Sequence, residues 1–305
     1  MVDVSPEICS SQRYPFPSWF RQELPDMKRV RAMREIFRRV RLSTVCESAR
    51  CPNLGKCWGR GVATFMILGD VCHRACRFCA VQTGHPLPPD PQEPGHVAFA
   101  VKELNLSYAV ITSVSRDDLA DFGAGQFVQT VKEIHGLVPD TKIEIFIPDF
   151  LCKTESLKMV AAAGPDVICH NVETVRRLSR KVRPQADYQR SLDVLRTLKD
   201  WRYRFYLKSG LMVGFGETKE DVRETMKDLL DCGCDILTIG QYLPPSRDER
   251  HLAVERFVSP GEFEDYKEMG EQLGFKHVMS GPLVRSSFLA EQGYAECSKK
   301  LGVLK

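Results

Sequence analysis

The sequence contains no long hydrophobic run. No apolar stretch in its 305 residues approaches the roughly 18 residues that a transmembrane helix requires, so we expect no membrane partner. The first residues include Asp3 and Glu7. They have neither the apolar core of a secretion signal nor the Arg- and Ser-rich, acid-poor composition of a transit peptide. These features predict a cytoplasmic protein.

The sequence also has little net charge. Its 43 Lys and Arg residues nearly balance 40 Asp and Glu residues, leaving +3, which is too small to indicate a nucleic-acid partner. Hydrophobic residues make up 43% and charged residues 27% of the chain, as in ordinary globular proteins. The length allows two small domains or one domain of barrel type.

Cysteine, in contrast, is abundant, with twelve residues. Because no secretion signal is visible, metal or redox use is favoured over disulfides. Half of the cysteines fall between Cys46 and Cys79, while the others are scattered along the chain. We therefore expect the function to depend on this short region.

The main motif of this region is a C-x3-C-x2-C sequence formed by Cys72, Cys76 and Cys79, directly after an apolar stretch at 65–68. Three thiolates on one loop can wrap a soft metal centre, but an all-cysteine iron–sulfur cluster and a structural zinc site each take four protein ligands. A site with three protein ligands leaves one metal coordination position open. The spacing therefore predicts a metal centre to which a small molecule binds.

A second triplet precedes the first, with Cys46, Cys51 and Cys57 in a C-x4-C-x5-C spacing on a loop containing Gly, Pro and Asn. Zinc sites usually pair their cysteines as C-x2-C at both ends, and only Cys76 and Cys79 have that spacing. Structural zinc and disulfides are the less favoured alternatives for these six residues.

The N-terminal region divides into two segments. Residues 1–26 are rich in Pro and aromatic residues and predict an extended arm. Residues 27–42 predict a helix, with apolar residues at three- and four-residue steps on one face and mostly Arg on the other. The basic face is either solvated or a docking surface for an acidic partner protein.

Beyond a Pro-rich loop at 85–95, short β-branched stretches alternate with helical patterns. Such alternation predicts parallel strands joined by right-handed helical crossovers. The expected strands are 65–70, 108–114, 142–147, 166–169, 204–213, 235–241 and 275–279. The expected helices are 97–106, 125–136, 154–163, 188–199, 218–231 and 260–272.

This pattern predicts an α/β fold, specifically a partial (β/α)6-type TIM-like barrel with N-terminal and C-terminal extensions. A doubly wound open sheet is the alternative. The expected division is an N-terminal extension at 1–60 with the basic helix and the second cysteine triplet, a barrel at 61–280, and a C-terminal segment at 281–305.

Polar or glycine-rich segments follow several of the expected strands, where parallel folds place their working residues. They are the segments 112–118, 170–174, 208–218 and 241–246. Each alone is consistent with a helix cap or a turn. Together they predict a mouth around the open cluster that binds a polar ligand of nucleoside size.

These motifs resemble those of the lipoyl synthases, a family of the radical S-adenosylmethionine superfamily. The Cys72 motif, with Phe78 before its last cysteine, matches the superfamily signature, and the Cys46 motif matches the family's auxiliary-cluster motif. Arg285-Ser286-Ser287-Phe288 resembles the family's Arg-Ser-Ser-Tyr motif. The likeness extends over residues 40–290 and includes the segments 170–175, 209–214 and 240–243.

The resemblance implies that Cys72, Cys76 and Cys79 hold a 4Fe–4S cluster whose fourth iron chelates S-adenosylmethionine. One electron would cleave this cofactor to a 5′-deoxyadenosyl radical. The radical would remove hydrogen from C6 and C8 of an octanoyl chain on a lysine of a lipoyl carrier domain, and sulfur would be inserted at both carbons. Because such carbons have no acidic proton, the chemistry needs a cofactor rather than a side-chain base.

By the same likeness, Cys46, Cys51, Cys57 and Ser287 would hold a second 4Fe–4S cluster that donates the sulfur and is consumed. An alkoxide on iron should be lost more easily than a thiolate. Ser286 is the competing candidate ligand, and a capping hydroxyl is the alternative role of Ser287. The implied partners are octanoylated carrier domains (dehydrogenase-complex acyltransferase subunits and the glycine cleavage H protein), an electron donor and an iron–sulfur carrier for cluster repair.

The likeness also suggests which residues surround S-adenosylmethionine. Ser113, Arg116 and Asp117 would lie at the methionine amino group, Asn171 and Glu173 at the ribose, and Gln241 and Tyr242 at the adenine. Arg285 would pair with a carboxylate or position the serine ligand.

The chain departs from the family pattern at three positions. Phe122 stands where glycine is usual, Phe288 replaces the tyrosine, and Ala80 stands where aspartate is common. Two other functions remain open: a different radical enzyme, resembling biotin synthase or a methylthiotransferase, and a non-catalytic iron–sulfur or zinc scaffold. The Cys46 triplet disfavours the first alternative.

Overall fold

A sheet of eight strands forms the centre of the computed structural model, which describes residues 17–21, 26–60, 62–201 and 203–300. The short β1 (Ser43–Thr44) pairs antiparallel with β2, and every other neighbouring pair is parallel. The parallel strands, in sheet order, are β2 (Thr64–Ile67), β5 (Tyr108–Ser113), β6 (Lys142–Phe146), β7 (Val167–Cys169), β8 (Tyr206–Val213), β9 (Ile236–Gln241) and β10 (His277–Gly281).

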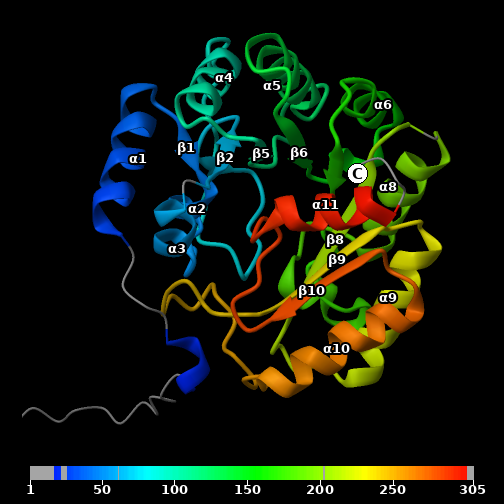
Figure 1. Ribbon diagram of the computed structural model, residues 1–305. Helices are drawn as coiled ribbons and strands as arrows, with labels where there is room; N and C mark the ends of the chain where they lie inside the picture. The colour runs from blue at the N-terminus through cyan, green and yellow to red at the C-terminus, as the bar shows by residue number, and fades with distance from the viewer. Residues whose placement is uncertain (1–16, 22–25, 61, 202, 301–305) are drawn as a thin grey trace, which may run out of the picture.

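A helix connects each parallel strand to the next. The main crossover helices are α4 (Glu93–Glu103), α5 (Ala124–Leu137), α6 (Thr154–Ala162), α8 (Tyr188–Asp200), α9 (Lys219–Asp231) and α10 (Pro260–Leu273). They form an outer row around the sheet (Figure 1). The sheet follows the chain order without the reversal of a doubly wound fold, and its end strands remain unpaired with each other in the described residues. The predicted partial barrel is confirmed.

Several short elements were not predicted from the sequence. They include a two-stranded sheet of β3 (Val71–Cys72) and β4 (Gln82–Thr83), and the helices α7 (Ser179–Val182) and α11 (Ala290–Lys300). The 3-10 turns η2 (Phe150–Cys152) and η3 (Arg176–Leu178) also belong to this group. The loop predicted at 85–95 ends earlier, because α4 starts at Glu93. Pro94 sits in its first turn, where proline lacks only a donor that the helix leaves unused.

The N-terminal segment packs on the edge of the barrel. The apolar face of α1 (Met27–Arg39) buries Val30, Met33 and Phe37, and the Phe37 ring contacts Trp58 and, edge-on, Phe65 of β2. The boundary predicted at residue 60 is therefore crossed by one continuous core. Most of the arm predicted at 1–26 lies outside the described residues, but Ser18–Phe20 forms the turn η1 and Phe20 contacts Phe257.

The C-terminal helix α11 covers the amino ends of the strands. Its Tyr294 ring lies 6.0 Å from the ring of Tyr108, the first residue of β5, and 5.9 Å from the ring of Tyr206, the first residue of β8. This leaves the carboxyl ends of the strands, on the opposite side, for a functional site. No helix among the described residues is long and apolar enough to cross a membrane.

An ion pair is buried inside the barrel. Lys208 Nζ lies 2.8 Å from Glu144 Oε1, and the two side chains are 2% and 1% exposed. The Tyr108 hydroxyl donates to the same carboxylate at 2.7 Å. Removing one partner leaves a buried charge with insufficient compensation, whereas replacing both with apolar residues avoids that penalty.

We expect Lys208→Met to lower the free energy of unfolding by about 3–5 kcal/mol, because Glu144 keeps a charge that nothing neutralises. The double variant Lys208→Met with Glu144→Leu should recover most of this loss. Urea unfolding followed by circular dichroism measures both. A double variant as unstable as the single one would contradict the role of charge.

Candidate active site

A cavity of about 530 Å³ opens at the carboxyl ends of the strands. Its volume lies within the roughly 300–1,000 Å³ of typical ligand pockets. All six cysteines of the two triplets line it, together with segments that follow β5, β6, β7 and β9 and with Leu211 and Met212 near the end of β8. The C-terminal segment 284–288 closes one part of the wall. Groups that are far apart in the sequence therefore share one space.

The loop with Cys72, Cys76 and Cys79 follows β2 at this mouth. Cys72 ends β3, whose pairing with β4 closes the loop at its base. Backbone N–H groups point at two of the sulfurs: those of Arg74 and Ser115 lie 3.4 and 3.3 Å from Cys72 Sγ, and that of Val81 lies 3.5 Å from Cys79 Sγ. Such N–H groups hydrogen-bond to sulfur and tune a bound cluster.

The second triplet is on two short helices rather than on the open loop that we predicted. Cys46 lies in α2 (Val45–Ser48), Cys57 lies in α3 (Leu54–Gly59), and Cys51 is in the turn between them. The Thr44 hydroxyl accepts from the N–H of Glu47 and starts α2. The turn is joined to the C-terminal segment, because the Asn53 amide donates to the Leu283 carbonyl at 2.6 Å.

The chemistry of both cysteine sets fits a cationic iron–sulfur group. All eleven cysteines of the described residues are free thiols. Burial, reinforced by the neighbouring thiols, raises the pKa of Cys76 and Cys57 to about 12 each, so the thiolates require a positive centre beside them. Within the described ranges no three His, Cys, Asp or Glu side chains are grouped to hold a single ion.

Ser286 and Ser287 have different surroundings. The Ser286 hydroxyl accepts from the Asn171 amide at 2.5 Å, which ties the C-terminal segment to the end of β7. In the described part of the chain no hydrogen bond engages the Ser287 hydroxyl, although Ser287 also lines the cavity. Among the described residues the Ser287 oxygen is thus left without a hydrogen-bond partner, and its role as the fourth ligand stays a prediction.

Five of the eight residues predicted around S-adenosylmethionine line the cavity: Ser113, Asn171, Glu173, Tyr242 and Arg285. The Ser113 hydroxyl is buried and has no partner among the described residues. Burial raises the pKa of Glu173 to about 7, even though Arg183 nearby acts to lower it. The Asn171 side-chain amide already donates one hydrogen bond to Ser286, so only the rest of its hydrogen-bonding capacity is left for a ribose.

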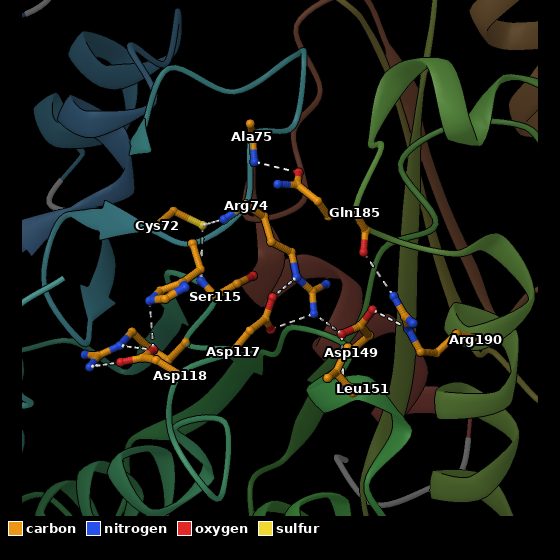
Figure 2. A network of polar contacts seen from close by, with 12 residues as sticks. Cys72, Arg74, Ala75, Ser115, Asp117, Asp118, Asp149, Leu151, Gln185 and Arg190 are labelled. Atoms are coloured by element: carbon orange, nitrogen blue, oxygen red, sulfur yellow. Dashed lines mark hydrogen bonds and ion pairs between the residues drawn. The ribbon is translucent and has the colours of Figure 1, made fainter. Parts of the chain in front are cut away.

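The other three predicted residues lie outside the cavity lining. Arg116 is 2% exposed and binds Asp118 with two hydrogen bonds. Asp117 accepts two from the Arg74 guanidinium (Figure 2). The Gln241 amide is buried and donates to the carbonyls of Val213, Tyr242 and Arg256. All three have partners within the protein, although Arg116 Nη1 has none among the described residues, and their contact with the cofactor stays a prediction.

Two residues that were given no individual role from the sequence line the cavity: His170, which lies in the predicted polar segment 170–174, and Arg183, which lies outside every predicted segment. Arg183 is buried beside Glu173; its Nε donates to the Ser179 hydroxyl and its Nη1 to the Asn171 carbonyl, while Nη2 has no partner among the described residues. His170 Nδ1 lies 2.9 Å from the Ile147 carbonyl and must be the donor, so Nε2 carries a lone pair. Burial lowers the pKa of His170 to about 4, which keeps it neutral. The only signal in the sequence for a role of either residue is that it lies after the strand β7.

The departures from the family pattern have visible consequences. Phe122 has φ 57°, a left-handed conformation that glycine adopts without strain, which explains why glycine is usual there. The ring of Phe288 lines the cavity, with Lys56 Nζ 5.4 Å from its centroid. The aromatic ring is thus kept at this position without the hydroxyl.

Comparison with known proteins decides the family. The sequence model of the radical SAM superfamily matches residues 66–229. A lipoyl synthase of Caldanaerobacter subterraneus subsp. tengcongensis is 50% identical over 279 residues, which are 91% of this chain and 96% of that protein. One of Caldicellulosiruptor saccharolyticus is 51% identical, over 90% and 96% of the two chains. The chain belongs to the lipoyl synthase family.

As a lipoyl synthase family member, the chain is a radical S-adenosylmethionine enzyme, which implies one 4Fe–4S cluster, S-adenosylmethionine and a lipoyl carrier substrate. The fold agrees. The crystal structure of HydG, a maturase of the [FeFe]-hydrogenase, aligns with a TM-score of 0.57 at 13% identity, over 77% of this chain and 54% of that one. The alternative of a non-catalytic scaffold is set aside by the family assignment.

Proposed function

We propose that the protein inserts two sulfur atoms, at C6 and C8, into an octanoyl chain bound to a lysine of a lipoyl carrier domain. The observation that supports this best is that both cysteine triplets and Ser287 line one cavity. A reaction that takes hydrogen and adds sulfur at the same carbons needs both functions within reach of one substrate.

In this proposal Cys72, Cys76 and Cys79 hold one 4Fe–4S cluster, and Cys46, Cys51, Cys57 and Ser287 hold a second. When bound, the first cluster with S-adenosylmethionine supplies one-electron removal of hydrogen from an unactivated carbon, and the second supplies sulfur. The protein's own groups bind and orient these partners. The N–H groups at Cys72 and Cys79 keep their sulfurs in place.

The polar residues of the cavity bind the cofactor by complementary charge. Arg183 has a buried guanidinium whose Nη2 has no partner among the described residues, and this group is suited to a carboxylate. Ser113 and the neutral His170 offer hydroxyl and imidazole groups for the amino and hydroxyl groups of the cofactor. Glu173 accepts from ribose hydroxyls, and the Tyr242 ring, stacked on Phe215 with centroids 4.2 Å apart, forms part of the adenine wall.

Apolar side chains supply the rest of the lining. They include Val45, Val62, Met66, Phe146, Leu211 and Met212. Such a surface suits a saturated chain and excludes water, which protects a reactive intermediate from side reactions.

An iron and sulfide count on anaerobically reconstituted protein tests the proposal. About eight irons per chain are expected, four for each cluster. Reduced protein should also form 5′-deoxyadenosine and the lipoyl product with an octanoylated carrier domain. A count of four or none would contradict the two-cluster assignment. The assay for lipoyl product also compares acyltransferase-subunit domains with glycine cleavage H protein as substrates. It needs an electron donor and, for repeated turnover, an iron–sulfur carrier. A cytoplasmic location stays a prediction.

The basic face of α1 is the proposed docking surface for an acidic carrier domain. Arg34 is engaged within the protein, with Glu47 at 2.9 Å and the Trp58 ring beneath it, and Arg39 pairs with Glu103. Arg31 and Arg38 are exposed and have no ion-pair partner among the described residues. These two arginines are therefore free to meet an acidic partner.

Changing Arg31 and Arg38 to Glu should weaken carrier binding about ten-fold at low salt and reduce its salt dependence, because charge attraction accelerates association. Binding kinetics at several salt concentrations measure this. The matched control changes exposed Arg223 and Lys227 of α9 to Glu, with the same change in net charge, and should bind normally. Equal binding by both double variants would favour a merely solvated face.

A further inference from the structure

The cysteine loop depends on contacts from outside itself for its shape. Between Cys72 and Cys79 it contains neither helix nor strand, so its own backbone provides few hydrogen bonds. Three loop residues are instead held by other parts of the chain, two of them by the segment that leads into α8. The Arg77 N–H donates to the Val182 carbonyl at 2.8 Å, and the Ala75 N–H donates to Gln185 Oε1 at 2.8 Å. The third, Arg74, is held through an aspartate.

Arg74 is joined to α8 by a buried chain of charges. Its Nη2 lies 2.7 Å from Asp149 Oδ1, and Arg190 Nε lies 2.7 Å from Oδ2 of the same carboxylate. Asp149 is 1% exposed and also accepts from the Leu151 N–H. Figure 2 shows Asp149 between the two arginines and Gln185 above it, with the Gln185 side chain directed at Ala75.

The backbone is strained directly after Asp149. The three residues that follow it, Phe150, Leu151 and Cys152, all have positive φ, at 44°, 50° and 58°. Non-glycine residues avoid this conformation, and a run of three persists only where the surrounding contacts impose it. The turn directs the N–H of Leu151 back to the Asp149 carboxylate at 3.1 Å.

We propose that Arg190 is a positioning residue for the cysteine loop. Its guanidinium holds two anchors at once: Nε binds Asp149, and Nη2 donates to the Gln185 carbonyl at 3.1 Å. Through them it fixes Arg74 and Ala75, two of the three residues between Cys72 and Cys76. Arg190 lies outside the cavity lining, so its effect on a bound cluster passes through these contacts. The inference rests on the proposed cluster at Cys72.

The test measures how fast an iron chelator removes iron in two backgrounds. The first carries Cys46, Cys51 and Cys57 changed to Ala, so that iron reports the Cys72 site alone. The second carries Cys72, Cys76 and Cys79 changed to Ala. Arg190→Ala should release iron about ten-fold faster in the first background, as expected for a lost supporting contact, and at the unchanged rate in the second.

Two further variants sharpen the result. Arg190→Lys keeps a charge for Asp149 but cannot also reach Gln185, so its rate should be intermediate. Arg196→Ala removes an exposed arginine from the same helix, where it binds Asp193, and should leave both rates unchanged. In Arg190→Ala, the change in the electron paramagnetic resonance signal on adding S-adenosylmethionine should also diminish.

Faster release in both backgrounds would show general destabilisation and overturn the inference, as would unchanged release in the first. If the first background with Arg190 intact binds no iron, the proposed cluster site itself fails, which separates the two failures.

Discussion

Cys76→Ala is expected to abolish formation of 5′-deoxyadenosine while the protein keeps half of its iron. Cys76 is the middle ligand of the open triplet and faces the cavity beside Glu173 and Arg183. Its loss leaves two thiolates on a loop that needs three. The iron count should fall from about eight to about four per chain, because the second triplet lies on separate helices and keeps its own cluster.

The matched control is Cys232→Ala. Cys232 is buried at the end of α9 and does not line the cavity. This variant should bind about eight irons and form product normally. If Cys76→Ala kept the full iron content, or still cleaved the cofactor, the assignment of the open cluster to Cys72, Cys76 and Cys79 would be wrong.

The sequence predicted the order of strands and helices well because each is coded by a local pattern. The strand predicted at 142–147 is β6 at Lys142–Phe146, and the helix predicted at 188–199 is α8 at Tyr188–Asp200. Buried parallel strands are short apolar runs, and amphipathic helices repeat every three or four residues. Since parallel strands end on the same side, the cavity was also predicted at their carboxyl ends.

The direction of polar side chains after a strand was less predictable. Asp117 and Asp118 are adjacent, and both bind residues of the cysteine loop, Arg74 and His73, instead of facing the cavity. No periodicity applies in a loop, and a partner such as Asp149 comes from another strand end. The same limit explains why Arg183 was missed: it becomes a site residue only because α7 ends beside Glu173.

Ser287→Ala is expected to separate the two halves of the reaction. Cleavage of S-adenosylmethionine should continue, because Ser287 is not a ligand of the proposed first cluster. Sulfur insertion should fall by about 100-fold or more, at the upper end of the cost of disturbing a metal site. With three thiolates left at Cys46, Cys51 and Cys57, most of the iron should remain. Quantifying 5′-deoxyadenosine and lipoyl product in one reaction gives both values.

Ser286→Ala is the control that the structure provides for this prediction. Its hydroxyl binds the Asn171 amide, so the change removes one hydrogen bond, worth about 1 kcal/mol or a factor of about five. That loss should lower the rates of cofactor cleavage and of sulfur insertion equally. Asn171 is predicted to lie beside the cofactor, and Ser287, the proposed cluster ligand, is the next residue in the chain after Ser286. A selective loss of sulfur insertion in Ser286→Ala, with normal product from Ser287→Ala, would exchange the roles of the two serines.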